Sequence, residues 1–306
     1  MPLTHTRTFR VRHSECDAYG HLNSVNYLRF MQETAFDASA AGGYDLQRYT
    51  AMKRYWLIRE TDIEYFEPIP YDASVEVKTW ISDFRRVTSR RAYEFRRAEI
   101  GSLCARAFTD WVFLDSETQQ PAAIPSALIA DFFPEGLPDS FPARSGFLRP
   151  PAPPSGIFTT RRRVAWHDLD SMFHVNNAVY MGYASECGFQ AIAAFGWPWD
   201  RFLEQGLAIL IRRCQIQYLQ PALYDDELEI SAWTSNVRRS MATRHYAIRR
   251  VRDEALLSQA NMLGVWVSTA SGKPMRIPSQ FLEDFAPNIT TEGGEVNLRW
   301  GLHRRA

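Results

Sequence analysis

A block of residues that recurs after 153 positions is the feature that most constrains how this chain can fold. Its polar and aromatic members match one for one: Asp17 with Asp170, His21 with His174, Asn23 with Asn176, and Tyr27 with Tyr180. The chain has 306 residues, twice that offset, and matches such as Trp80 with Trp233 continue along both halves without a gap. The sequence therefore predicts two copies of one domain.

Length and charge narrow the class of protein. Each half is long enough to bury a core of its own. The 35 basic and 35 acidic residues leave no net charge, so we expect neither nucleic acid nor an anionic membrane as a partner. The chain shows no signal-peptide core and no apolar run of about 18 residues, which favours a cytoplasmic protein. None of the four cysteines is matched between the copies, so we expect no disulfide framework, no metal and no other cofactor.

Both halves carry the same order of secondary-structure signals. In the first half, apolar residues at helical spacing predict a helix over 27–41. Segments rich in β-branched and aromatic residues predict strands over 6–14, 56–66, 74–83, 86–98 and 103–114, and again over 159–167, 207–219, 227–236, 239–251 and 256–268, around a second helix over 179–195. This order predicts an α+β fold, with an antiparallel sheet and one principal helix in each half.

The two halves are joined by a proline-rich segment. Seven prolines lie between positions 134 and 154, a composition that favours an extended, semi-rigid connector. We therefore place one domain at 1–135, the linker at 136–157 and the second domain at 158–306. The simplest packing is an intrachain pseudo-dimer in which each copy covers a sheet edge of its twin, and further homo-oligomerisation is left open.

The repeated motif resembles that of a known family. An aspartate, a histidine four residues on, an asparagine and a tyrosine, placed between a strand and a long helix, resemble the hotdog-fold thioesterases of the 4-hydroxybenzoyl-CoA thioesterase type. The stretch from Asp168 to Glu186 is also similar to plant and bacterial acyl-ACP thioesterases. The resemblance implies two tandem hotdog domains, each a curved antiparallel sheet around a central helix. It also implies an active site at their interface, with Asp17 or Asp170 as the catalytic carboxylate.

A single carboxylate is chemically sufficient for the hydrolysis of a thioester. A thioester releases a thiolate, whose conjugate thiol has a pKa of about 8.5, so its departure needs little help from a general acid. Asp17 or Asp170 would then act either as base toward water or as direct nucleophile. Free N–H groups where the helix begins, near Tyr27 or Tyr180, would polarise the carbonyl.

The matched histidines and asparagines can be interpreted in two ways. His21 and His174 could hydrogen-bond the turn or the carboxylate, and Asn23 and Asn176 could orient water or hold the thioester. The alternative is that these are ordinary turn residues, with Ser24 and Asn177 as helix N-caps. As substrate-binding candidates we take Gly20, Tyr27, Tyr180, Ser24 and Asn177.

The two copies also differ within the motif. Gly20 would allow close approach of a substrate, whereas Phe173 at the matched position could narrow or reshape the second pocket. The sequence thus leaves open one working and one degenerate site. Paired arginines along the strands, among them Arg90 and Arg91, could form a basic rim for phosphates or for an acidic carrier protein, or could simply face water.

The sequence as a whole predicts hydrolysis of an acyl thioester, acyl-CoA or acyl-ACP, as in fatty acid metabolism. Two rivals on the same fold remain. One is a catalytically silent acyl-CoA binding module or sensor, and the other is a hydratase acting on an enoyl or hydroxyacyl thioester. The fold alone excludes neither rival.

Overall fold

The computed structural model describes residues 1–144 and 146–290. The elements of the first copy are β1 (Thr4–Arg10), η1 (His13–Glu15), α1 (Ser24–Ala41), α2 (Leu46–Ala51), β2 (Arg54–Tyr65), β3 (Ser74–Phe84), β4 (Thr88–Arg97), β5 (Leu103–Asp115) and α3 (Ser126–Phe132). Those of the second are β6 (Phe158–Arg163), η2 (Trp166–Asp168), α4 (Asn177–Ala194), α5 (Trp199–Glu204), β7 (Leu207–Tyr218), β8 (Glu227–Ser235), β9 (Met241–Arg250), β10 (Leu256–Ser268), α6 (Ser279–Phe285) and η3 (Ala286–Asn288).

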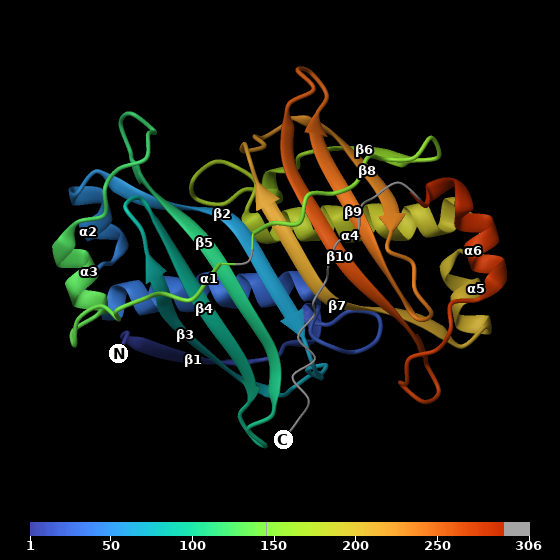
Figure 1. Ribbon diagram of the computed structural model, residues 1–306, viewed down its shortest axis with the longest axis horizontal. Helices are drawn as coiled ribbons and strands as arrows, with labels where there is room; N and C mark the ends of the chain where they lie inside the picture. Colours follow the sequence, from blue (N-terminus) through green and yellow to red (C-terminus); the bar gives the residue numbers. More distant parts are fainter. Residues whose placement is uncertain (145, 291–306) are drawn as a thin grey trace.

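The strands of both copies form one continuous sheet. Its order is β1-β3-β4-β5-β2-β7-β10-β9-β8-β6, and every neighbouring pair is antiparallel. Strands β2 and β7 pair at the centre, so each copy covers what would otherwise be an open edge of the other (Figure 1). The packing expected for an intrachain pseudo-dimer is thus the one observed.

The central strand pair also locates the pseudo-twofold axis. In the β2–β7 register, Asp62 lies opposite Gln215. These two residues are counterparts at the 153-residue offset, so the axis that relates the copies passes between them. A side-chain hydrogen bond of 3.1 Å from Gln215 to Asp62 crosses it.

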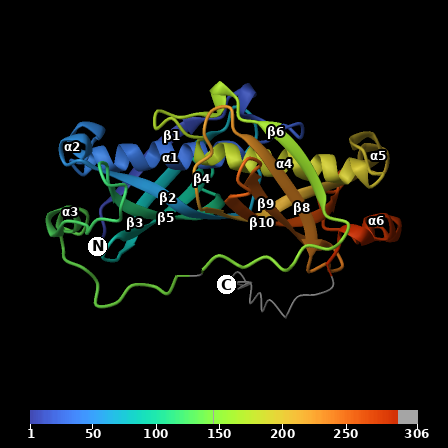
Figure 2. The same ribbon diagram turned by 90° about the horizontal axis from the view of Figure 1, so that it is seen from above.

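The two long helices lie on one face of the sheet and the linker runs along the other (Figure 2). Helix α1 buries Leu28, Met31, Ala35 and Ala38, the apolar positions that predicted it. Since each copy is a curved antiparallel sheet around one principal helix, the predicted fold class of two tandem hotdog domains is confirmed. No helix in the described part of the chain is long and apolar enough to cross a membrane.

The structure corrects several element boundaries. The first predicted strand ends at Arg10 rather than residue 14, because His13–Glu15 turn into a short 3-10 helix. Helix α1 begins at Ser24, three residues earlier than predicted. The prediction also missed α2, α3, α5 and α6, whose six or seven residues are too few to show helical periodicity.

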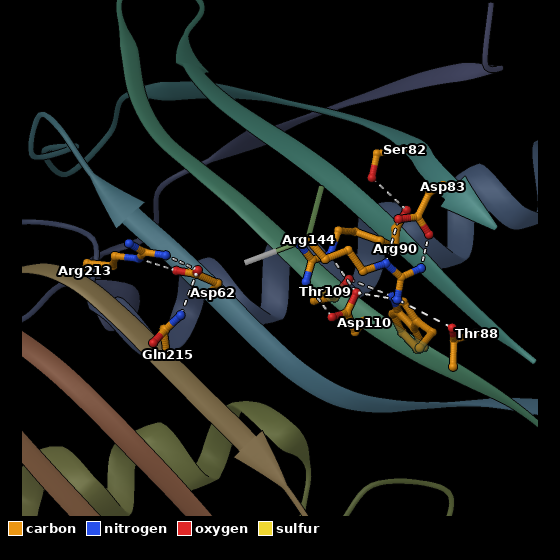
Figure 3. Close-up of polar contacts among 11 residues, drawn as sticks. Asp62, Ser82, Asp83, Thr88, Arg90, Thr109, Asp110, Arg144, Arg213 and Gln215 are labelled. Carbon is orange, nitrogen blue, oxygen red and sulfur yellow. Dashed lines mark hydrogen bonds and ion pairs between the residues drawn. The ribbon is translucent and has the colours of Figure 1, made fainter. Parts of the chain in front are cut away.

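The linker is attached to the outer face of the sheet. Arg144 forms ion pairs with Asp83 on β3 and with Asp110 on β5 (Figure 3). Further along, the backbone carbonyl of Leu148 accepts a hydrogen bond of 2.7 Å from Asn261 on β10. The proposed division at 135 and 157 stays a prediction, and positions 291–306 of the second domain lie outside the described residues.

Candidate active site between the two copies

The first repeated turn holds Asp17 in a fixed position. Its carboxylate accepts hydrogen bonds from the backbone N–H groups of Tyr19, at 2.9 Å, and His21, at 3.2 Å. The backbone N–H of Asp17 donates to the carbonyl of His21 at 2.8 Å, which closes the turn. Asp17 therefore keeps one defined orientation at the surface of the cavity described below.

Helix α1 begins directly after this turn. Asn23, not Ser24, is its N-cap: Asn23 Oδ1 accepts the N–H of Val25 at 2.9 Å. The N-cap prediction for Ser24 and Asn177 is thus wrong by one residue, since each is the first residue of its helix and Asn176 caps α4. The N–H of Ser24 donates to no acceptor among the described residues, so a helix N-terminal donor stays available beside Asp17.

The matched tyrosines are part of the core beneath the turns. Tyr27 packs edge-on against Tyr65, with ring centroids 5.1 Å apart, and burial raises the pKa of Tyr27 well above its usual range. In the second copy, the Tyr180 hydroxyl accepts the N–H of Ala222 at 2.9 Å. Burial raises the pKa of Tyr180 to about 12. Both groups stay protonated near neutral pH, so neither is a proton acceptor at pH 7.

The second turn repeats the geometry but is internally paired. Asp170 accepts the N–H of Met172 at 2.9 Å, and His174 Nδ1 lies 3.7 Å from Asp170 Oδ1. The amide of Asn176 donates to Gln32 Oε1 on α1 at 3.0 Å and to Asp170 Oδ2 at 3.4 Å. The polar groups of this site therefore satisfy one another across the interface between the copies.

A cavity of about 820 Å³ adjoins the first turn. One wall holds residues of that turn and the helix start, including Asp17, His21, Asn23, Ser24 and Tyr27. The remaining wall comes largely from α4, α5 and strands β7, β9 and β10 of the second copy, and includes Phe189, Ile192, Ile209, Met262 and Trp266. Such a volume suits a small-molecule ligand. Polar groups gather where the turn lies, and the part reaching into the second copy is mainly apolar.

Gly20 and Phe173 occupy matched positions in the two turns, and neither lies where the sequence analysis expected it. Gly20 has φ of +78°, which favours glycine, but Gly20 does not line the cavity. Phe173 adopts a similar positive φ of +61° and is 73% exposed. The prediction that Phe173 narrows the second pocket is therefore wrong, because its ring lies in solvent.

Some of the paired arginines are engaged within the fold. Arg91 is buried, and Arg90 makes two hydrogen bonds to Asp110, at 2.7 and 2.6 Å. Arg250 is held by Asp253 and lies 3.6 Å from Asp226. Arg85, Arg86, Arg238 and Arg239, by contrast, are exposed, so the use of the arginines for phosphates or a carrier protein stays a prediction.

Sequence reasoning missed two residues that shape the cavity. Ser185 on α4 lines it, and the buried Ser185 Oγ has no hydrogen-bond partner among the described residues. Gly264 on β10 also lines it. Their counterparts are Gln32 and Trp111, so a search for residues shared by the copies discards both. Ser185 and Gly264 could have been found only by looking for positions at which the two copies differ.

Comparisons with known proteins agree with this architecture. Two hotdog units that share one sheet define a double-hotdog fold. The chain belongs to the thioesterase-like superfamily, whose family model matches residues 11–132 and 164–285. Both copies are covered, so the predicted family resemblance is confirmed.

One relative and two solved structures illustrate the likeness. The chloroplastic acyl-[acyl-carrier-protein] hydrolase of Cuphea viscosissima is 24% identical over 194 residues, covering 60% of this chain and 47% of its own. The alignment thus spans about half of that relative. The 12:0-ACP thioesterase from Umbellularia californica superimposes with a TM-score of 0.68 at 17% identity, covering 87% of this chain and 94% of its own. An acyl-ACP thioesterase from Bacteroides thetaiotaomicron gives 0.68 at 16% identity, covering 85% and 97%.

Proposed function

We propose that this protein hydrolyses acyl thioesters to a free acid and a thiol. The observation that carries the proposal is the meeting of Asp17, an available helix N-terminal N–H and the 820 Å³ cavity at one place between the copies. Membership of the thioesterase-like superfamily supports it, as do relatives named as acyl-ACP hydrolases. An acyl thioester of coenzyme A or of acyl carrier protein is the proposed substrate, and a cytoplasmic location remains a prediction.

The reaction needs only a few groups. The Ser24 N–H would donate to the thioester carbonyl as negative charge develops there, and the adjoining helix dipole would add to that stabilisation. Asp17 would either remove a proton from water as it attacks the carbonyl carbon or attack that carbon itself. In both cases the C–S bond breaks and the sulfur leaves as thiolate. Direct attack by Asp17 leaves a mixed anhydride, whose hydrolysis by water releases the acid and restores the carboxylate. Asn23 would orient the water or the thioester, and both Asn23 and His21 line the cavity.

The assay is release of free thiol from acyl-CoAs and acyl-ACPs of several chain lengths. Asp17→Asn should lower kcat by about 10²- to 10⁴-fold, the usual contribution of a positioned base. Asp72→Asn is the matched control, because Asp72 is an exposed carboxylate that pairs with Arg10 outside the cavity. Asn also tolerates the φ of +70° found at Asp72.

The outcomes separate the candidate functions. Equal turnover in Asp17→Asn and the parent, with unchanged melting, would remove Asp17 from the mechanism. Binding of acyl-CoA without thiol release by the parent would favour the sensor. Addition of water to an enoyl-CoA with its thioester intact would favour the hydratase.

A further inference from the structure

Arg244 on β9 places a positive charge in the wall of the cavity beside the first turn. This residue is partly buried and lines the cavity. Its guanidinium donates a hydrogen bond of 2.8 Å to the carbonyl of Gly188 on α4 and lies over the ring of Phe285, 5.1 Å from the centroid. Among the described residues, no carboxylate forms an ion pair with Arg244.

The hydroxyl of Tyr246 lies beside this guanidinium. A Cβ added at Gly188 would lie 2.5 Å from the Tyr246 hydroxyl and 3.4 Å from Arg244 Nη1, so both groups meet α4 at a residue that has no side chain. Tyr246 also lines the cavity, and burial raises its pKa well above the usual range. A guanidinium has only donors, and a protonated phenol can donate as well. This part of the wall therefore offers two donors to a ligand.

The matched tyrosine of the first copy has a partner that Tyr246 lacks. The Tyr93 hydroxyl and Thr109 Oγ1 lie 3.1 Å apart and share a buried hydrogen bond. The counterpart of Thr109 in the second copy is Met262, which lines the cavity and carries only a weakly accepting sulfur. The polar group that satisfies Tyr93 in the first copy is thus missing where the second copy faces the cavity.

The matched arginine shows what packing alone requires. Arg91 is 6% exposed, and its guanidinium lies over Phe132 at 5.9 Å from the ring centroid. Phe132 is the counterpart of Phe285, so an arginine stacked on this phenylalanine is part of the fold in both copies. Stacking therefore explains why an arginine is present, and the cavity beside Arg244 gives that arginine a ligand to meet.

Two further cavity residues differ between the copies in the same direction. Thr234 stands where the first copy has Ile81, and Trp266 stands where it has Phe113. Trp266 is 4% exposed, and its indole N–H has no hydrogen-bond partner among the described residues. A buried donor without a partner is costly unless water or a ligand satisfies it. Groups that can form hydrogen bonds thus replace hydrocarbon in the half that lines the cavity.

We propose that the cavity binds an acyl group with a carboxylate at its far end, and that Arg244 and Tyr246 hold this carboxylate. A carboxylate suits the two N–H groups of a guanidinium and supplies the negative charge that this part of the wall lacks. The kinetic consequence rests on the proposed function: the substrate would be the mono-thioester of a dicarboxylic acid, and hydrolysis would release the diacid. Binding of the carboxylate can be tested without turnover.

The kinetic test compares each ω-carboxyacyl-CoA with the unsubstituted acyl-CoA of the same carbon number, over about four to ten carbons. The parent should favour the carboxylated member of at least one pair by about 10-fold in kcat/KM, as expected for hydrogen bonds to a charged group. Arg244→Gln should lower kcat/KM for that substrate by about 10- to 100-fold and leave its unsubstituted match within about threefold of the parent.

Tyr246→Phe is the milder variant and serves if Arg244→Gln does not fold. It removes one donor and keeps the ring, so the preference for the carboxylated substrate should fall about fivefold. Tyr93→Phe is the matched control, because it removes the same hydroxyl in the first copy from a residue that does not line this cavity. The control should leave the preference as in the parent.

The binding test uses S-(ω-carboxyalkyl)-coenzyme A thioethers of the same lengths, with S-alkyl-coenzyme A as the reference. Neither compound has a thioester to hydrolyse. Calorimetry with the full chain should show about 10-fold tighter binding of the carboxylated thioether in at least one pair. Arg244→Gln should bind the two members of that pair equally.

Failures of the two proposals can be told apart. Equal or weaker binding of the carboxylated thioether in every pair would overturn the carboxylate site, as would a preference that persists unchanged in Arg244→Gln and Tyr246→Phe. A preference in binding that Arg244→Gln removes, without thiol release from any acyl thioester, would contradict hydrolysis and leave the carboxylate site in place.

Discussion

Arg213 on β7 forms an ion pair with Asp62 on β2, so a guanidinium of the second copy neutralises a carboxylate of the first (Figure 3). Both side chains are largely buried where the two halves of the sheet join. Removing the cation would leave a buried carboxylate without its main counter-charge.

We therefore expect Arg213→Ala to lower the free energy of unfolding by about 3 kcal/mol, the usual cost of breaking a buried pair. The control is Arg163→Ala, whose partner Asp225 is 61% exposed, like Arg163 itself, and which should cost less than about 1 kcal/mol. Urea unfolding measures both. Equal losses would show that the pair at the joint contributes no more than a surface pair.

Acid should weaken the attachment of the linker through His245. This buried imidazole contacts Ser235 and Asn261, each at 2.7 Å, and Asn261 in turn donates to the linker carbonyl of Leu148. Burial lowers the pKa of His245 from 6.5 to about 4. The unfolded chain therefore binds a proton more readily, so this contribution is intact above pH 6.5 and is lost as the pH falls toward 4.

The expected loss at His245 is about 3 kcal/mol, at 1.36 kcal/mol for each pH unit. It is measured as the difference in unfolding free energy between the parent and His245→Gln at pH 7 and at pH 4. A difference that does not change with pH would contradict a neutral buried imidazole.

Glu60 should give the opposite pH dependence from His245, because its contribution to stability is lost as the pH rises. Burial, with the charge of Asp110 adding to it, raises the pKa of Glu60 from 4.5 to about 7, and Glu60 Oε1 has no partner among the described residues. The folded state binds this proton more tightly, so the contribution is greatest below pH 4.5 and is lost as the pH rises through 7. Glu60→Gln should therefore be more stable than the parent at pH 8, but not at pH 4.5. Parallel stability curves would disprove the assignment.

Asn23 has a structural and a proposed chemical role that two substitutions can separate. Asn23→Ser keeps an N-cap oxygen but removes the amide, so melting should stay near that of the parent while kcat/KM falls about 10-fold. Asn23→Ala removes the cap as well and should cost about 1 kcal/mol of stability. If Asn23→Ser turns over substrate like the parent, the residue serves only as a cap.

The repeat allowed much of the fold to be predicted, because each core strand and each long helix carries its own apolar pattern twice. The motif predicted the turn, and the structure places Asp17, His21 and Asn23 together beside the cavity. What the sequence did not reveal is how the copies face each other. Ser185 and Asn23 line the same cavity because the β2–β7 register aligns the halves, and no local pattern encodes that register. The exposure of Phe173 likewise depends on the direction of its own side chain, which the sequence does not predict.

The pairing of Asp62 with Gln215 on the pseudo-twofold axis has an evolutionary consequence. In a dimer of identical chains, any residue on the axis meets a copy of itself, and every substitution is made twice. Covalent fusion removes that restriction. One half carries a glycine at position 264 where the other carries a tryptophan at the matched position 111, a difference that two identical chains could not have. Each half of the linked chain can thus change independently of the other.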